Sequence, residues 1–170
     1  RPSYIHSFGM TENHVVLAAY PLVVEPLRLL TSGKPFAENL EWQPERGTRF
    51  WVVRKSDGEI VGQHRAEARF CFHHVNAFEE GDDLVVDMVN YPDASIIDDL
   101  YLERLRGADG AVVDGRLERI RLRKGEARAD WQTVSDQRLE LPRINYDRVA
   151  GRPYECVWGG SQREHGNFID

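Results

Sequence analysis

The chain has only two cysteines among its 170 residues, Cys71 and Cys156. They lie too far apart for a zinc knuckle or a Cys-x-x-Cys redox motif, and they are too few for a disulfide scaffold. Both occur in apolar, strand-like runs. We therefore expect two buried thiols in a reducing compartment rather than a disulfide bridge.

Long apolar runs and basic clusters are also missing. No stretch approaches the roughly 18 apolar residues that a transmembrane helix needs, and no signal peptide opens the chain. The 22 Lys and Arg residues are mixed with 28 Asp and Glu residues, for a net charge of −6. Because there is no basic stripe, we do not expect nucleic acid as a partner. These absences favour a cytoplasmic protein.

The length and composition suit one globular domain, since 41% of the residues are hydrophobic and 29% are charged. The chain begins without methionine, at Arg1, and ends in residues 167–170, which resemble the middle of a strand. We therefore expect residues 1–170 to be part of a domain in a longer chain.

Short β-rich runs separated by turn signals recur along the chain. The stretch from Phe70 to Asp87 is a predicted hairpin, whose turn is Glu80 to Asp83. An Asp-Gly turn joins the runs 48–54 and 60–65. Further strands are expected at 4–10, 14–20, 115–123, 127–134, 139–145 and 154–158. This rhythm indicates an all-β sandwich, barrel or propeller, and the spacing does not decide among them.

Two segments break the β pattern. Ser95 resembles the N-cap of a short helix, in which apolar residues recur every four positions until Gly107. The segment 21–40 is apolar around Pro26 and then becomes a loop. Its apolar residues lie either in a core beneath the loop or in a surface patch that meets a membrane or an apolar substrate.

Two of the predicted hairpins carry histidine on their first strand: His6 on one, and His73 with His74 on the other. Neighbouring side chains in a strand point to opposite faces, so His73 and His74 cannot both face the same site. His64 lies among polar residues and is expected on the surface. A histidine in an apolar strand is more often a packed core residue than a metal ligand, so the pattern alone leaves the metal hypothesis open.

Three motifs in series resemble those of one family. They are residues 5–16 (IHSFGMTENHVV), 72–80 (FHHVNAFEE) and 141–146 (LPRINY) followed by 151–154 (GRPY). Together they resemble the carotenoid cleavage oxygenases, which include carotenoid dioxygenases, stilbene-cleaving dioxygenases and the retinoid isomerohydrolase of the visual cycle. The resemblance spans nearly all 170 residues.

The resemblance implies several blades of a seven-bladed β-propeller with a short helical insertion, and an iron(II) ion, Fe(2+), on the propeller axis. Members of the family hold this iron with four histidines from different blades. His6 and His73 match two of them, and His74 falls on a variable position. The resemblance places the other two histidines outside this chain, and likewise the glutamates that support the histidine ligands of the family. Neutral imidazoles suit iron(II). Phe72 either lines the apolar tunnel that leads to the iron or packs in the core.

The function implied is cleavage of a C=C bond of a carotenoid, apocarotenoid or stilbene by O2, which gives two carbonyl products. Two alternatives stay open: an isomerohydrolase of the same family, and a non-catalytic propeller fragment that lacks two of the four ligands. We expect this chain alone to be inactive. The family's membrane-facing patch falls near residues 27–30, which implies a peripheral membrane contact.

Overall fold

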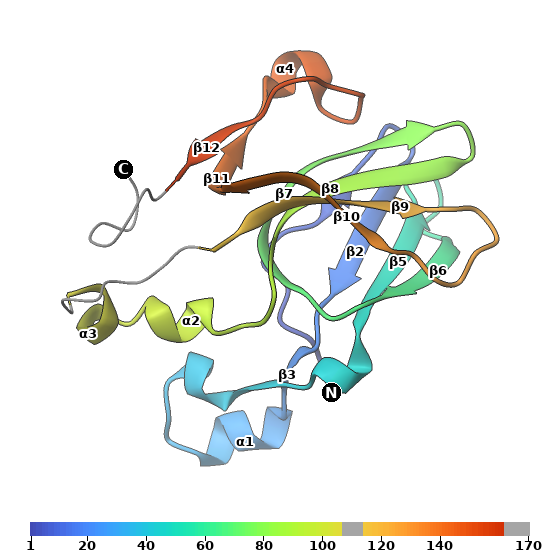
Figure 1. Ribbon diagram of the computed structural model, residues 1–170. Coiled ribbons are helices and arrows are strands. Elements are labelled where there is room, and N and C mark those ends of the chain that lie inside the picture. Colours follow the sequence, from blue (N-terminus) through green and yellow to red (C-terminus); the bar gives the residue numbers. More distant parts are fainter. Residues whose placement is uncertain (107–113, 162–170) are drawn as a thin grey trace.

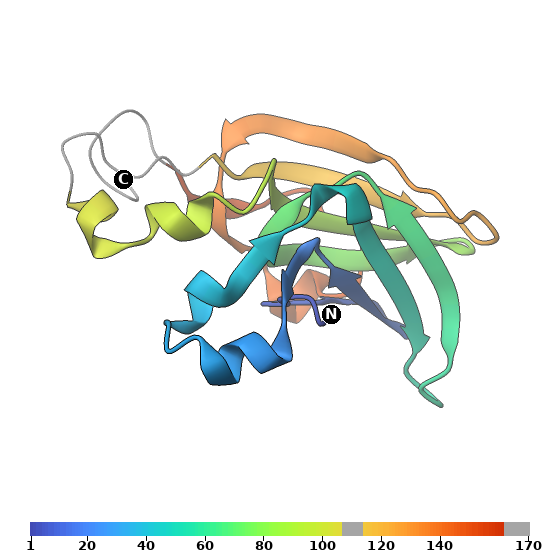
Figure 2. The ribbon, with the colours of Figure 1, turned by 90° about the horizontal axis from the view of Figure 1, so that it is seen from below.

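The computed structural model describes residues 1–106 and 114–161 (Figure 1). The predicted helix end at Gly107 and the chain end at 167–170 lie outside these residues. Antiparallel strands are the main regular structure of the described residues, and the largest sheets are two four-stranded ones that stack face to face (Figure 2). Side chains from both sheets fill one hydrophobic core between them.

The first sheet has the strand order β1-β2-β5-β6. Its strands are β1 (Gly9–Met10), β2 (His14–Ala19), β5 (Thr48–Arg54) and β6 (Ile60–Ala66). Alternation explains its buried face: Val16 and Ala18 on β2 lie beside Phe50 and Val52 on β5, and all four are buried. The hairpin predicted at 48–65 is confirmed.

The second sheet has the order β10-β9-β8-β7. Its strands are β7 (Phe70–Glu80), β8 (Asp83–Tyr91), β9 (Arg116–Leu122) and β10 (Trp131–Arg138). Gly81 takes the positive φ of the tight turn between β7 and β8 (φ 63°). The hairpin predicted at 70–87 is therefore confirmed, as is the strand predicted at 115–123.

The remaining elements are short. Two further pairs are antiparallel: β3 (Leu22–Val24) with β4 (Leu40–Trp42), and β11 (Glu140–Arg143) with β12 (Trp158–Gly160). The α-helices are α1 (Pro26–Thr31), α2 (Ile96–Asp99), α3 (Leu102–Leu105) and α4 (Tyr146–Val149). Two 3-10 turns are η1 (Phe36–Asn39) and η2 (Pro44–Arg46). Helix α1 lies beyond the ends of the large sheets (Figure 1).

The first strands of successive sheets lie side by side, because β1 contacts β7 and β7 contacts β11. Gly9 permits the first of these contacts: a Cβ atom there would lie 3.2 Å from the Cβ of Ala77 and 3.4 Å from Cγ1 of Val86. Antiparallel sheets whose first strands meet in this way are typical of neighbouring propeller blades. The predicted all-β class is confirmed.

Several predicted elements differ in the structure. In the run 4–10 only β1 is a strand, although Ser3 forms an isolated bridge to Val23. The last strand within the described residues is 158–160, not 154–158. The predicted single helix is two one-turn helices, α2 and α3. Ser95 does not cap α2 with its side chain, because its own backbone is helical and its N–H donates to Asp93.

Two burial predictions were wrong. Cys156 is exposed, whereas Cys71 is buried as expected. His64 is only 6% exposed, because β6 pairs it with Phe50 and so places it on the inner face of the first sheet. Burial lowers the pKa of His64.

Candidate metal centre

His6 and His73 lie together although 66 residues separate them in the chain. Their ring centroids are 5.1 Å apart and the ring planes meet at 85°. His6 is in the segment that leads into β1, and His73 is on β7, so the contact between these two strands brings the rings together. His6 is exposed, and the His73 side chain is 29% exposed. Both rings are therefore at least partly exposed to solvent.

A hydrogen-bond acceptor faces Nδ1 of each ring. Nδ1 of His73 lies 2.6 Å from Oε1 of Glu140, and Nδ1 of His6 lies 3.2 Å from the backbone oxygen of Phe72. Because a carboxylate and a carbonyl only accept, each Nδ1 carries the proton and donates. The Nε2 lone pairs then remain available to bind a metal, and among the described residues neither Nε2 has a hydrogen-bond partner. This arrangement fits neutral imidazole ligands with outer-shell support.

Glu140 corrects the expectation that the supporting glutamates lie outside this chain. Its carboxylate is buried, and it accepts hydrogen bonds from His73, from the backbone N–H of Leu141 at 2.9 Å and from the hydroxyl of Tyr91. Burial raises the pKa of Tyr91, and the adjacent Glu140 carboxylate raises it further. Three donors therefore hold the carboxylate in place against His73.

The backbone of Leu141 explains why sequence alternation did not reveal Glu140. Leu139 and Leu141 flank Glu140, so a regular strand would bury the leucines and expose the glutamate. Leu141 instead has φ of 51° and is the only non-glycine residue with positive φ in the described part of the chain. The register of β11 is irregular between Glu140 and Arg143. Consequently Glu140 is 3% exposed and Leu141 is 46% exposed.

The register of β7 is also irregular on both sides of His74. Successive pairs with β8 shift between Cys71 and His74 and again between His74 and Asn76. Bulges of this kind re-aim side chains and interrupt the ladder, and they are common beside functional sites. Phe72 and His73 have no ladder partner in the register with β8. The Phe72 carbonyl is therefore free to accept from His6.

Phe72 lies between the core and the histidine pair. Its ring packs edge-on against Phe70 at 4.7 Å and against Tyr91 at 6.0 Å between centroids. The same ring meets His6 at 5.5 Å and 77°. The side chain is half-buried. Both interpretations of Phe72, as core residue and as wall of a substrate site, agree with this position.

His74 contacts a different partner from His73, as strand alternation predicts. Its Nδ1 lies 2.8 Å from Oγ of Ser7, and its Nε2 is buried without a partner among the described residues. Burial, together with the nearby His73, lowers the pKa of His74 to about 3. His74 is therefore neutral near pH 7.

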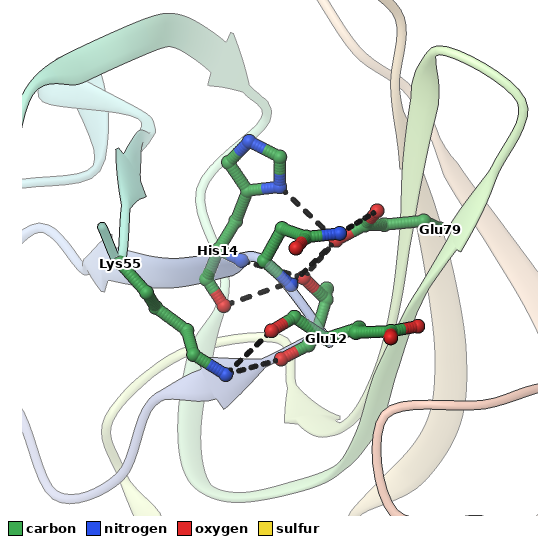
Figure 3. A network of polar contacts seen from close by, with 6 residues as sticks. Glu12, His14, Lys55 and Glu79 are labelled. Carbon is green, nitrogen blue, oxygen red and sulfur yellow. Dashed lines mark hydrogen bonds and ion pairs between the residues drawn. The ribbon is translucent and has the colours of Figure 1, made fainter. Parts of the chain in front are cut away.

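Glu79 joins the first two motifs. Its carboxylate accepts from the Thr11 hydroxyl at 2.6 Å, from the backbone and side chain of Asn13 at 2.9 and 3.0 Å, and from Nδ1 of His14 at 3.1 Å. Burial opposes ionisation, but these hydrogen bonds outweigh it and lower the pKa of Glu79 to about 2. Lys55 donates to the carbonyls of Thr11 and Glu12 and closes the network (Figure 3).

Asn76 joins the second motif to the third. Its side-chain N–H groups donate to the carbonyls of Val149 and Arg152 at 3.0 and 2.9 Å. Its oxygen accepts the N–H of Gly151 at 3.0 Å. All donors and acceptors of the side chain thus serve to hold the 149–152 turn against β7.

The histidine pair is not accompanied by further ligands nearby. In residues 1–106 and 114–161, no group of three or more His, Cys, Asp and Glu side chains is arranged to hold a metal ion. Likewise, no helix in these ranges is both long enough and apolar enough to cross a membrane. The structure brings His6 and His73 together, and their role as metal ligands stays a prediction.

The large sheets stack and their first strands meet, which is the arrangement of β-propeller blades. Two adjacent histidines lie at this contact, one on β7 and the other in the segment just before β1. A family model described as RPE65, retinal pigment epithelial membrane protein, matches residues 1–170. The chain belongs to this family of carotenoid oxygenases.

Three similar proteins illustrate the match. A carotenoid isomerooxygenase of Galleria mellonella is 35% identical over 92% of this chain and 33% of its own length. A variant of the apocarotenoid oxygenase of Synechocystis is 25% identical with a TM-score of 0.78, over 94% of this chain and 33% of that one. The lignostilbene dioxygenase of Pseudomonas brassicacearum is 28% identical with a TM-score of 0.72, over the same shares. The chain spans about a third of each relative.

Proposed function

We propose that the complete protein is a non-haem iron(II) dioxygenase, in which residues 1–170 form part of the propeller domain. It would cleave a C=C bond of a carotenoid, apocarotenoid or stilbene into two carbonyl products. The observation that carries the proposal is the pair His6 and His73, each with Nδ1 held by an acceptor and Nε2 open. The names of the similar proteins supply the substrate classes.

In this proposal the residues of the chain hold and orient the metal. His6 and His73 would supply two neutral nitrogen ligands, and Glu140 would keep the His73 ring in one tautomer and one orientation. Iron(II) with open coordination positions would supply the activation of O2. Phe72 would offer an apolar, aromatic surface beside His6 for a conjugated substrate.

The test is the iron content of the complete protein, purified anaerobically with added iron(II) and measured by mass spectrometry. We expect stoichiometric iron in the wild type and loss of most of it in His6→Ala and in His73→Ala. His14→Ala is the matched control, because it removes a histidine that contacts Glu79 and lies outside the pair. Full iron occupancy in both pair variants would refute the proposal.

Products formed under labelled O2 distinguish the proposed reaction from its alternatives. A dioxygenase transfers label from O2 into the carbonyl products. An isomerohydrolase takes its oxygen from water, and a non-catalytic propeller forms no product. Products whose new oxygen is unlabelled, and so comes only from water, would therefore replace the proposed cleavage with the isomerohydrolase reaction.

We also propose that the protein is cytoplasmic and meets a membrane surface through α1. Leu27 is 71% exposed and Leu30 is 83% exposed, and no residue of α1 is buried. Leucines that remain exposed on a short helix favour contact with an apolar phase over a role in the core.

A further inference from the structure

The Ser7 hydroxyl connects the two chain segments that carry the histidine pair. Its Oγ lies 2.7 Å from the carbonyl oxygen of Phe72, 3.0 Å from the backbone nitrogen of His74 and 2.8 Å from Nδ1 of the same residue. Ser7 follows His6 directly, and its two partners flank His73 on either side. These contacts therefore join the two candidate ligands through their immediate neighbours.

All hydrogen-bonding capacity of this hydroxyl is used. A serine hydroxyl has one proton and two lone pairs. The Phe72 carbonyl can only accept, so it takes the proton. Both lone pairs then accept, one from the backbone N–H of His74 and the other from Nδ1–H of its ring. Three bonds to a single oxygen restrict how far the segment at Ser7 can move against β7.

The Phe72 carbonyl extends this network to the candidate ligand itself. It accepts from Ser7 and also from Nδ1 of His6 at 3.2 Å, so the same oxygen that anchors Ser7 orients the His6 ring. The register of β7 is irregular here and gives Phe72 no partner residue in the ladder. His73 is oriented separately, by Glu140.

We propose that Ser7, supported by His74, is a positioning residue that sets the placement of His6 relative to His73 and thereby tunes metal affinity; this inference rests on the proposed function. The competing explanation is that Ser7 only stabilises the fold. Thr11 offers the comparison, since its hydroxyl also joins the first segment to β7: it donates to Glu79 at 2.6 Å and accepts from the His14 N–H at 2.9 Å.

The experiment compares Ser7→Ala, Ser7→Thr and Thr11→Val in the complete protein. Titration with cobalt(II) gives metal affinity and an absorption spectrum that reports ligand geometry, and thermal melting without metal gives stability. We expect Ser7→Ala to weaken cobalt affinity by about 10- to 100-fold, the usual effect of losing an outer-shell partner, and to alter the spectrum. Ser7→Thr retains the hydroxyl and should restore both. Thr11→Val should lower the melting temperature but leave affinity and spectrum unchanged.

The outcomes distinguish a failure of the positioning role from a failure of the proposed metal centre. If the wild type binds cobalt through His6 while Ser7→Ala binds it equally well with the same spectrum, the positioning role is refuted and the metal centre stands. If the wild type binds no cobalt, both fail. Should Ser7→Ala not fold, Ser7→Cys keeps a side chain of similar shape with a weaker donor and acceptor. Ser7→Cys should then bind cobalt more weakly than the wild type, by less than the roughly 10- to 100-fold expected for complete loss of the hydroxyl. Wild-type cobalt affinity in Ser7→Cys would again refute the positioning role.

Discussion

Replacing Glu140 with glutamine tests how much its charge contributes to the candidate metal centre. The buried carboxylate accepts through Oε1 from His73 and from the N–H of Leu141, and through Oε2 from Tyr91. A glutamine oxygen at the first position keeps two of these bonds. Its amide can donate to the Tyr91 oxygen once that hydroxyl rotates. The substitution therefore removes the charge and largely retains the geometry, whereas alanine would leave several buried donors without partners.

The expected loss of iron(II) affinity follows from the weakening of the hydrogen bond between His73 and residue 140. A charge-assisted hydrogen bond is roughly twice as strong as a neutral one, so the bond to His73 loses about 1 to 1.5 kcal/mol. The carboxylate raises the basicity of the ligated imidazole, so this loss falls mainly on the metal-bound state. Because about 1.4 kcal/mol corresponds to a tenfold change in affinity, Glu140→Gln should weaken iron(II) binding about tenfold. This value lies at the lower end of the roughly 10- to 100-fold range for outer-shell partners.

The assay is an anaerobic iron(II) titration of the complete protein, with Glu118→Gln as the matched control. Glu118 is also buried, and it accepts from Arg69 at 3.0 Å and Asn90 at 2.9 Å, away from the histidine pair. The control should lose stability and keep its iron affinity. The reasoning would be refuted if Glu140→Gln bound iron as tightly as the wild type, or if Glu118→Gln weakened binding equally.

Two further predictions concern acid stability and membrane contact. Because the pKa of Glu79 falls from 4.5 to about 2 on folding, its ionised form stabilises the fold above about pH 4.5, and this contribution is lost as the pH falls towards 2. In urea titrations Glu79→Gln should be less stable than the wild type at neutral pH and should lose less stability on acidification; parallel pH profiles would contradict this. Replacing Leu27 and Leu30 together with serine should reduce binding to phospholipid vesicles at least tenfold, since burial of one leucine contributes roughly 1.5 to 3 kcal/mol. Ile60→Ser, at another exposed apolar residue, should leave binding unchanged, and equal losses in both would point to general surface hydrophobicity.

The hairpins could be predicted because their turns and strands agree at the local level. Gly58 and Gly81 take positive φ at the two turns where Asp-Gly and Glu-Gly-Asp signals occur. The strand at 48–54 matches β5 at both ends. Where a turn residue and a β-rich run support each other, tertiary contacts only have to select the partner strand.

The candidate site was predicted less completely because it depends on departures from regular pairing. Alternation correctly separates His73 from His74, but it places Glu140 on the exposed face and gives no indication of the positive φ at Leu141. It also cannot show that a second sheet covers His64. These features arise from contacts between segments far apart in the chain, and residue periodicity carries no information on them.

The contacts of the motif residues explain why the motifs extend well beyond the histidines. Two ligands on separate segments, one on β7 and the other just before β1, can share a metal only if the segments keep a fixed offset, and a single β contact permits slippage. Glu79 fixes β7 to the turn before β2 through four hydrogen bonds from Thr11, Asn13 and His14, so that loss of the Thr11 bond alone leaves the offset in place. Asn76 fixes the same strand to the turn at Gly151. Variants at Glu79 or Asn76 should therefore affect metal affinity only as far as they let the two segments shift. Glu140 instead contacts the His73 ring directly, and Ser7 acts on His6 through the Phe72 carbonyl.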